Sequence, residues 1–222
     1  YGLGIYYTEK EDFQQAVESS KKAIALFSGS LYFYHLFINS SERLKQLDNA
    51  EALSLNISKK EPGNSAALYG PAYLRYRQRK FDEAMEHIEK AIKLNPGEPI
   101  FYRSKCDIYR DTGQNKEMLA LALDKVKTLE NLDPDLQIDF YTRISTAYRV
   151  LGQYQNSFEY DEKGLKIARE IGNKKSEGII LGNMGVHYAH LGNFPEAMKL
   201  FNQKLIVVRE LNAKEEEVQI LS

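Results

Sequence analysis

The chain has 222 residues, of which 43% are hydrophobic and 27% are charged, and its formal net charge is −1. This composition is typical of a folded protein and excludes a disordered chain. A net charge close to zero provides no overall basic field for a nucleic acid backbone, and no stretch reaches the roughly 18 to 20 apolar residues of a membrane span. The single cysteine, Cys106, excludes an internal disulfide framework and a zinc site built from cysteines.

Taken in chain order, segment 1–30 is a partial first repeat, in which 1–9 resembles only the end of a helix. This partial helix, together with the lack of an initial Met and of a recognisable signal peptide, predicts that the chain starts inside a repeat. Two further segments, 31–64 and 65–98, then follow a common pattern. A 34-residue shift aligns large and small apolar positions: Phe13, Ala16 and Ala23 with Leu47, Ala50 and Ile57, and again with Phe81, Ala84 and Ala91. A period of this size is typical of stacked helical hairpins.

The segment 65–98 shows the predicted hairpin most clearly. Residues 65–79 are expected to form one helix, 80–82 a turn and 83–94 the antiparallel partner helix. Asn95, Pro96 and Gly97 end the second helix, because Pro and Gly do not continue it and allow the chain to reverse. Pro71 lies inside the first helix and lacks a backbone donor, so we expect a kink or a late helix start there.

A fourth hairpin is predicted over 99–133, with Gly113 in its turn. Asp133 and Pro134 are a capping residue and a first-turn proline, and they mark the next helix start. Beyond this point the pattern recurs at a 40-residue period, which gives predicted hairpins over 134–173 and 174–213. Residues 214–222 are expected to begin a truncated seventh hairpin, and the full protein is expected to continue beyond Ser222.

Small residues recur where two helices must approach closely. In the first helices these are Gly4, Ala72, Cys106, Ser145 and Gly185, and in the second helices Ala16, Ala50, Ala84, Ser157 and Ala197. Ile38 and Met118 stand at the same positions in two other helices and have larger side chains. The alternation predicts an all-α fold of stacked antiparallel helix hairpins, in which Cys106 is a buried structural thiol.

The spacing resembles the tetratricopeptide repeat (TPR) over essentially the whole chain. The matching residues include Leu3-Gly4-Ile5-Tyr6-Tyr7, Phe81 with Ala84, Ala91 and Pro96, and Met184-Gly185-Val186-His187-Tyr188 with Phe194, Ala197 and Phe201. The chain lacks the Trp that most often stands in the first helix of this family. The last two repeats resemble its 40-residue subclass. The resemblance implies a right-handed α-solenoid, a TPR superhelix in which the first helices line a concave groove.

The groove face implied by this resemblance is rich in Tyr and Arg, which are common at binding hot spots. We therefore expect a peptide ligand with acidic groups or a terminal carboxylate. The candidate peptide-binding residues are His35, Asn39, Tyr69, Tyr73, Tyr76, Arg77, Arg103, Asp107, Arg110, Thr142, Arg143, Thr146, Arg149 and Asn183. A solvated helix face explains the same residues without a ligand, and some of the tyrosines fit a core position.

Two ligand-binding patterns of the family match the chain to different degrees. The fixed carboxylate-binding set of chaperone-binding members is absent, because Tyr1, Ile5 and Gly70 occupy comparable positions. Asn183 matches an Asn that often bonds the ligand backbone in the 40-residue subclass. His187 and His190 have a spacing that could share a metal, but no carboxylate or Cys joins them at helical spacing. No catalytic motif, metal site or cofactor is therefore predicted.

The sequence as a whole favours a non-enzymatic protein-protein interaction scaffold that binds a peptide or partner segment in the groove. The alternative is a regulatory sensor domain whose output region lies outside this fragment. Nucleic acid and a membrane span are not expected, whereas end-to-end self-association is plausible. A cytoplasmic location is expected, with the periplasm left open. The partner, organism and pathway are not encoded in any motif.

Overall fold

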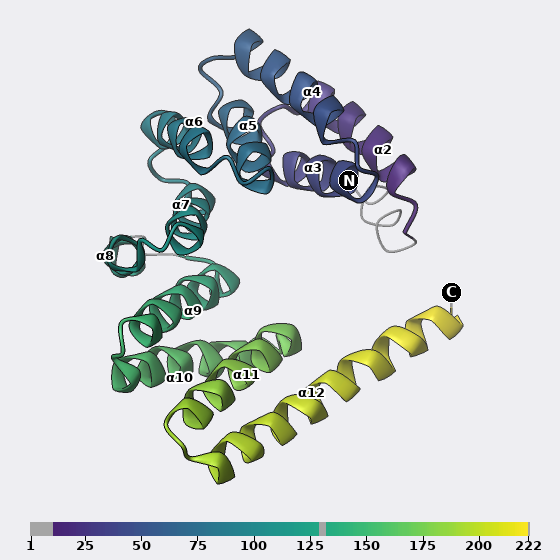
Figure 1. Ribbon diagram of the computed structural model, residues 1–222. Helices are drawn as coiled ribbons and strands as arrows, with labels where there is room; N and C mark the ends of the chain where they lie inside the picture. Colours follow the sequence, from purple (N-terminus) through teal and green to yellow (C-terminus); the bar gives the residue numbers. More distant parts are fainter. Residues whose placement is uncertain (1–10, 129–131, 222) are drawn as a thin grey trace. The chain divides into compact units, whose positions relative to one another are not determined.

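The computed structural model describes residues 11–128 and 132–221, and the side chains of these residues up to Leu211. Within these residues the secondary structure is helical, and consecutive helices pair as antiparallel hairpins (Figure 1). The predicted all-α fold is therefore confirmed. The chain divides into two compact units, residues 1–108 and 109–222. Gly4 and the predicted helix end at 1–9 lie outside the described residues.

Unit 1 is built from successive helices that pack in antiparallel pairs. Its helices are α2 (Phe13–Leu26), α3 (Leu31–Arg43), α4 (Leu47–Lys60), α5 (Ser65–Arg77), α6 (Phe81–Leu94) and most of α7 (Pro99–Asp111). Helices α2 and α3, α4 and α5, and α5 and α6 pack directly, and α3 also contacts α5. The first helices of successive repeats are therefore neighbours, which places their side chains on a shared face.

Unit 2 continues the same construction with longer helices. It contains α8 (Asn115–Thr128), α9 (Pro134–Val150), α10 (Tyr154–Glu170), α11 (Lys174–His190) and α12 (Phe194–Leu221). Helices α9 and α10 form one hairpin and α11 and α12 the next, while α10 packs on α11. Asp133 caps α9 by accepting a hydrogen bond from the backbone nitrogen of Asp135, with Pro134 in the first turn, as predicted.

The predicted close-contact residues are buried. Ala16, Ala50, Ala84 and Ser157 are fully buried, and Ala197 is 2% exposed. Among the first helices Ala72, Cys106, Ser145 and Gly185 are buried as well, and so are the larger Ile38 and Met118. These positions carry the repeat because a small side chain lets the neighbouring helix approach.

A residue in the left-handed region recurs in the turn that joins the two helices of a hairpin. It is Lys45, Arg79 and then Gly113 at a 34-residue period, with φ of 58°, 60° and 76°. At each of these turns two backbone hydrogen bonds close the helix end, for example from Arg79 N to Tyr76 O and from Lys80 N to Arg75 O. This is a Schellman ending, which favours glycine at the left-handed residue.

Two predictions about helix ends are wrong. Helix α5 begins at Ser65, where the Asn64 side chain accepts hydrogen bonds from two backbone nitrogens, so the late start, one of the two effects expected of Pro71, does not occur. The turn predicted before residue 214 is absent, because α12 continues without a break to Leu221. The previous repeat ends α10 with Gly172 in the left-handed region, whereas a 40-residue shift places Asn212 at that position.

Candidate functional site

Six side chains on α3 and α5 form a connected group, here called the α3–α5 cluster: His35, Asn39, Glu42, Tyr69, Tyr73 and Arg77. The Tyr73 hydroxyl donates a hydrogen bond to Asn39 Oδ1 at 2.8 Å, and the His35 ring lies 4.2 Å from the Tyr73 ring. His35 and Tyr69, and likewise Asn39 and Tyr73, are one 34-residue period apart, so the repeat itself brings them together. Asn39 is exposed, and His35 and Tyr73 are half-buried.

Tyr69 belongs to the core, which corrects its assignment as a ligand-contacting residue. Its side chain is fully buried and its ring lies 5.5 Å from that of Phe101. The hydroxyl lies 2.8 Å from His35 Nε2 and 2.9 Å from Ser104 Oγ on α7. A buried Tyr hydroxyl needs such partners, and burial raises the pKa of Tyr69. Tyr69 therefore positions His35 from beneath the surface.

Arg77 is present in the cluster, but its charge is compensated. It forms an ion pair with Glu42 and donates a hydrogen bond to Asn39 Oδ1 at 2.6 Å. It also donates to the Tyr73 hydroxyl at 3.1 Å, and its guanidinium carbon lies 5.8 Å from the Tyr73 ring centroid. Sequence reasoning missed Glu42, because a pairing between residues so far apart in the chain leaves no local signal.

The local field around His35 is positive. Burial, with smaller contributions from the charges of Arg103 and Arg77, lowers the pKa of His35 to about 4. The imidazole is therefore neutral near pH 7, and it acts as a hydrogen-bonding and stacking group instead of a cation. Arg103 and Asp107 of α7 are half-buried, whereas Tyr76 packs near Phe81 of α6, at 6.1 Å between ring centroids.

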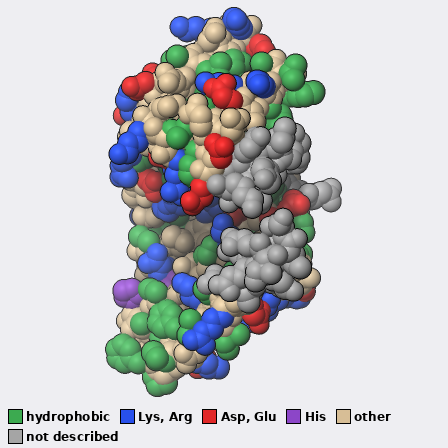
Figure 2. All heavy atoms as spheres, turned by 90° about the vertical axis from the view of Figure 1, so that its right-hand side faces the viewer, with side chains coloured by type: hydrophobic (Ala, Val, Ile, Leu, Met, Phe, Trp, Pro, Cys, Tyr) green, Lys and Arg blue, Asp and Glu red, His purple; other side chains and the backbone are tan. Residues whose placement is uncertain are grey.

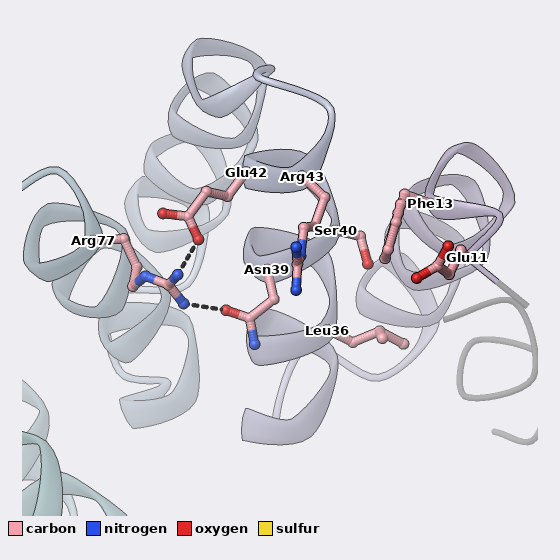
Figure 3. A pocket seen from close by; sticks show the side chains of 8 residues that line it. All are labelled: Glu11, Phe13, Leu36, Asn39, Ser40, Glu42, Arg43 and Arg77. Carbon is pink, nitrogen blue, oxygen red and sulfur yellow. Dashed lines mark hydrogen bonds and ion pairs between the residues drawn. The ribbon is translucent and has the colours of Figure 1, made fainter. Parts of the chain in front are cut away.

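A pocket of about 390 Å³ lies beside the cluster in unit 1. Figure 3 shows Arg77 bound to Glu42 and Asn39 on one side and Arg43 directed toward the space between α3 and Phe13. The remaining lining residues are Glu11, Leu36 and Ser40. Arg43 is exposed and makes no ion pair within the described residues; it lies 5.8 Å from the Phe13 ring centroid. Sequence reasoning missed Arg43, although it precedes Arg77 by one 34-residue period.

In unit 2 the candidates are distributed over α7, α9 and α11. Arg110 is exposed and pairs with Asp111 at 2.9 Å. Thr142 donates to the Ile138 carbonyl and Arg143 to the Asp139 carbonyl, each at 2.9 Å within α9. Thr146, Arg149 and Asn183 are half-buried. Thr142, Arg143, Thr146 and Arg149 lie on α9 and Asn183 lies on α11, and these two helices contact each other.

A buried polar group, also missed from the sequence, lies between α9, α10 and α11. His187 and Asp161 are each 1% exposed, and His187 Nδ1 lies 3.2 Å from Asp161 Oδ2. Ser157 and Ser145 join them, with 3.0 Å between their hydroxyl oxygens. His190 is exposed, so the two histidines predicted as an unlikely metal pair have different environments. Within the described residues no group of three or more His, Cys, Asp or Glu could hold a metal ion.

Family models for the tetratricopeptide repeat match residues 66–98 and 137–205. Both segments are thus tetratricopeptide repeats. A curated relative, Hsp70-Hsp90 organizing protein 2 of Arabidopsis thaliana, is 27% identical over 167 residues, which cover 74% of the chain and 26% of that relative. The chain thus spans about a quarter of this TPR relative's length.

Solved TPR-like structures support the same fold. The crystal structure of BtubC (BKLC) from P. vanneervenii has a TM-score of 0.73 at 13% identity, covering 91% of this chain and 90% of that one. YrrB, described as a TPR protein with an unusual peptide-binding site, has a TM-score of 0.53 at 19% identity, covering 90% and 100%. These likenesses show the helical solenoid fold. None of the described helices is both long and apolar enough to cross a membrane.

Proposed function

We propose that unit 1 of this TPR protein binds a peptide segment of a partner protein over the exposed surface of α3 and α5, so that the chain acts as a non-enzymatic interaction scaffold. The observation that carries this proposal is the α3–α5 cluster, in which Tyr73, Asn39 and Arg77 are joined by hydrogen bonds. Relatives that organise Hsp70 and Hsp90, and the peptide-binding protein YrrB, support this function class.

The cluster suits recognition because its side chains are already ordered. Binding costs about 0.5–1.5 kcal/mol for each flexible side chain that must be immobilised. Hydrogen bonds to neighbouring helices hold Tyr73 and Arg77 in place before a ligand arrives. The half-buried Tyr73 ring offers apolar area, and the exposed Asn39 amide offers a donor for a peptide carbonyl.

We further propose that the ligand carries acidic groups and that Arg43, more than Arg77, contacts a ligand carboxylate. Arg77 already forms an ion pair with Glu42, whereas Arg43 has no described ion pair and borders the pocket. The charges of Arg103 and Arg77, which add to the effect of burial in lowering the pKa of His35, also favour a negatively charged ligand. An Arg guanidinium binds a carboxylate through two parallel hydrogen bonds, which adds direction to the contact.

Selection from a phage-displayed library of random 12-residue peptides tests this proposal on the full chain. We expect enrichment of Asp and Glu, and an affinity for the best synthetic peptide that weakens as salt increases. Arg43→Glu and Asn39→Ala should each reduce this affinity by about tenfold, since each removes a contact to a charged or polar group. Lys93→Glu, on an exposed position of α6, makes the same charge change and serves as the control. Equal losses for Arg43→Glu and Lys93→Glu would refute the site.

Three related predictions from the sequence remain proposals. Asn183 is proposed to bond a ligand backbone in unit 2, which Asn183→Ala tests in the same assay. End-to-end self-association is tested by the molar mass of the purified chain in light scattering. The regulatory sensor alternative depends on an output region, which the sequence of the parent gene would reveal.

A further inference from the structure

Two exposed apolar side chains stand at the end of α2 in unit 1. Leu26 is 75% exposed and Phe27 is 66% exposed, the two highest values among the large hydrophobic side chains that the structure describes. They are consecutive in the chain, and we call them the α2 tip. Single apolar side chains are common on protein surfaces, whereas neighbouring ones at this exposure mark a surface that another molecule covers.

The repeat architecture does not require apolar side chains at these positions. A 34-residue shift aligns the α2 tip with Lys60 and Glu61, and a second shift aligns it with Leu94 and Asn95. All four of these residues are exposed, and only Leu94 is apolar. The same two positions therefore face solvent in the following two repeats, and the exposure of the α2 tip is a property of its place within the repeat. Packing between repeats does not account for the apolar character of the tip.

Hydrogen bonds hold the α2 tip beside the end of α4. The hydroxyl of Ser28, the residue after Phe27, donates to Glu61 Oε2 at 2.7 Å. Asn64 Nδ2 donates to Ser28 Oγ at 3.1 Å and to Glu61 Oε2 at 2.8 Å. The loop is thus anchored to the connection between α4 and α5, where Asn64 also caps α5. A tip that is already held in place loses little conformational freedom when it is bound.

Lysine side chains surround the α2 tip. Lys22 lies one helical turn before Leu26 on α2, and Lys59 and Lys60 stand in the last turn of α4. All three lysines are exposed and have no ion pair within the described residues. Figure 2 shows basic side chains at the upper end of the view, where α4 ends in Figure 1. Lysine suits the end of a helix through the helix dipole, but the dipole does not explain why the apolar tip lies between these positive charges.

We propose that the α2 tip inserts into the interface of an anionic membrane, with Lys22, Lys59 and Lys60 at the level of the lipid phosphates. Apolar side chains enter the boundary between headgroups and acyl chains, while lysine keeps its charged end among the headgroups. Each lysine near an anionic membrane surface strengthens binding by about fivefold. A protein partner would need a pocket shaped to the tip, whereas a bilayer accepts a projecting tip without a matched shape.

The binding is reversible, because two side chains bury less apolar area than a single acyl chain, which by itself binds a membrane only marginally. The surface is distinct from the peptide site proposed above. The α2 tip precedes the start of α3 at Leu31, whereas Arg43 and the pocket lie at the other end of this helix. The two proposals are therefore independent.

The chain contains no Trp, so Phe27→Trp introduces a single fluorescent reporter into the α2 tip. The full chain with this substitution is titrated with phosphatidylcholine vesicles, and with vesicles that contain in addition about 30% phosphatidylserine. We expect the tryptophan emission to shift to shorter wavelength with the anionic vesicles only, because the indole enters an apolar environment. Lipids brominated on the acyl chains should quench this emission.

Further variants separate the two parts of the site. In the Phe27→Trp background, the combined change Lys59→Gln and Lys60→Gln should lower the partition coefficient about 25-fold, since each lysine accounts for about fivefold. Lys116→Gln, at an exposed position of α8, makes the same change of charge and should leave partitioning unaltered. With the natural residue at position 27, the chain should sediment with anionic vesicles, and Phe27→Ser should abolish this sedimentation.

Three results would overturn the proposal. These are an emission spectrum that anionic vesicles do not shift, equal partitioning with and without Lys59 and Lys60, and sedimentation with vesicles that survives Phe27→Ser. A measurement without lipid covers the remaining occupant. If the emission shifts to shorter wavelength as the chain alone is concentrated, a second copy covers the α2 tip and membrane insertion is excluded.

Discussion

Gly70 on α5 provides the sharpest test of the packing between first helices. A Cβ atom at this position would lie 2.6 Å from Cδ1 and 2.9 Å from Cε1 of Tyr34 on α3. Carbon atoms do not approach so closely, so the Tyr34 ring or the α3–α5 distance would have to change. Tyr34 is fully buried and belongs to the cluster that includes Phe37 and Ile38, which leaves the ring little room to move.

Gly70→Ala is expected to destabilise the protein, whereas the higher helix propensity of Ala alone would stabilise it. In an unobstructed helix interior, Gly→Ala stabilises by about 0.8–1 kcal/mol. Overpacking a well-filled core costs about 1–3 kcal/mol, and the short distances to Tyr34 place Gly70 in the upper part of this range. We therefore expect Gly70→Ala to lower the free energy of unfolding by about 1–2 kcal/mol, the difference between these two terms.

Gly178 on α11 is the matched control, because its added Cβ would lie 3.5 Å from Val207 Cγ1, an ordinary contact. Gly178→Ala should therefore stabilise the protein, within the limit of about 1 kcal/mol set by helix propensity. Urea unfolding followed by far-UV circular dichroism measures both variants. In a Tyr34→Leu background the cost of Gly70→Ala should disappear. If Gly70→Ala alone stabilises as Gly178→Ala does, the close approach of α3 and α5 is wrong.

Three further predictions follow from particular groups in unit 1. Glu42→Gln should release Arg77, because it removes the carboxylate that competes with the ligand. The affinity for an acidic peptide should then rise about three- to tenfold in anisotropy titrations. An unchanged affinity would show that Arg77 does not face the ligand. Arg79→Gly should stabilise the chain against urea by about 0.5–1 kcal/mol, since φ is 60° at this position, and a loss of stability would contradict the left-handed turn. The folded-state pKa of His35 is about 4, below its ordinary value of 6.5. As the pH falls from 6.5 to 4, the unfolded chain therefore binds a proton at His35 before the folded chain does. This difference lowers the free energy of unfolding by about 3 kcal/mol in total. His35→Gln should remove this component of the pH dependence of unfolding, and identical pH profiles for the two proteins would be inconsistent with the burial of His35.

The amino-acid sequence alone was sufficient to predict the hairpins and the contacts that repeat. Ala50, Ala84 and Ala197 recur with the repeat period, and all three are buried as predicted. The reason is that each hairpin packs on its neighbour in the same way, so the same small residue is needed at each crossing. Caps and breakers such as Asp133 and Pro134 act within a few residues and are equally readable.

The tertiary structure decided which of these side chains remain available to a ligand. Tyr69 and Tyr73 lie one helical turn apart on α5, yet Tyr69 is buried under α7 and Tyr73 reaches the surface. Glu42 neutralises Arg77 while Arg43 remains unpaired among the described residues, and Asp161 meets His187 across two helices. Such pairings join residues far apart in the sequence, and they depend on rotamers and helix distances that the periodic pattern does not contain. The sequence thus specifies the face that each helix buries, whereas the charge and exposure of the binding surface are set by contacts between helices.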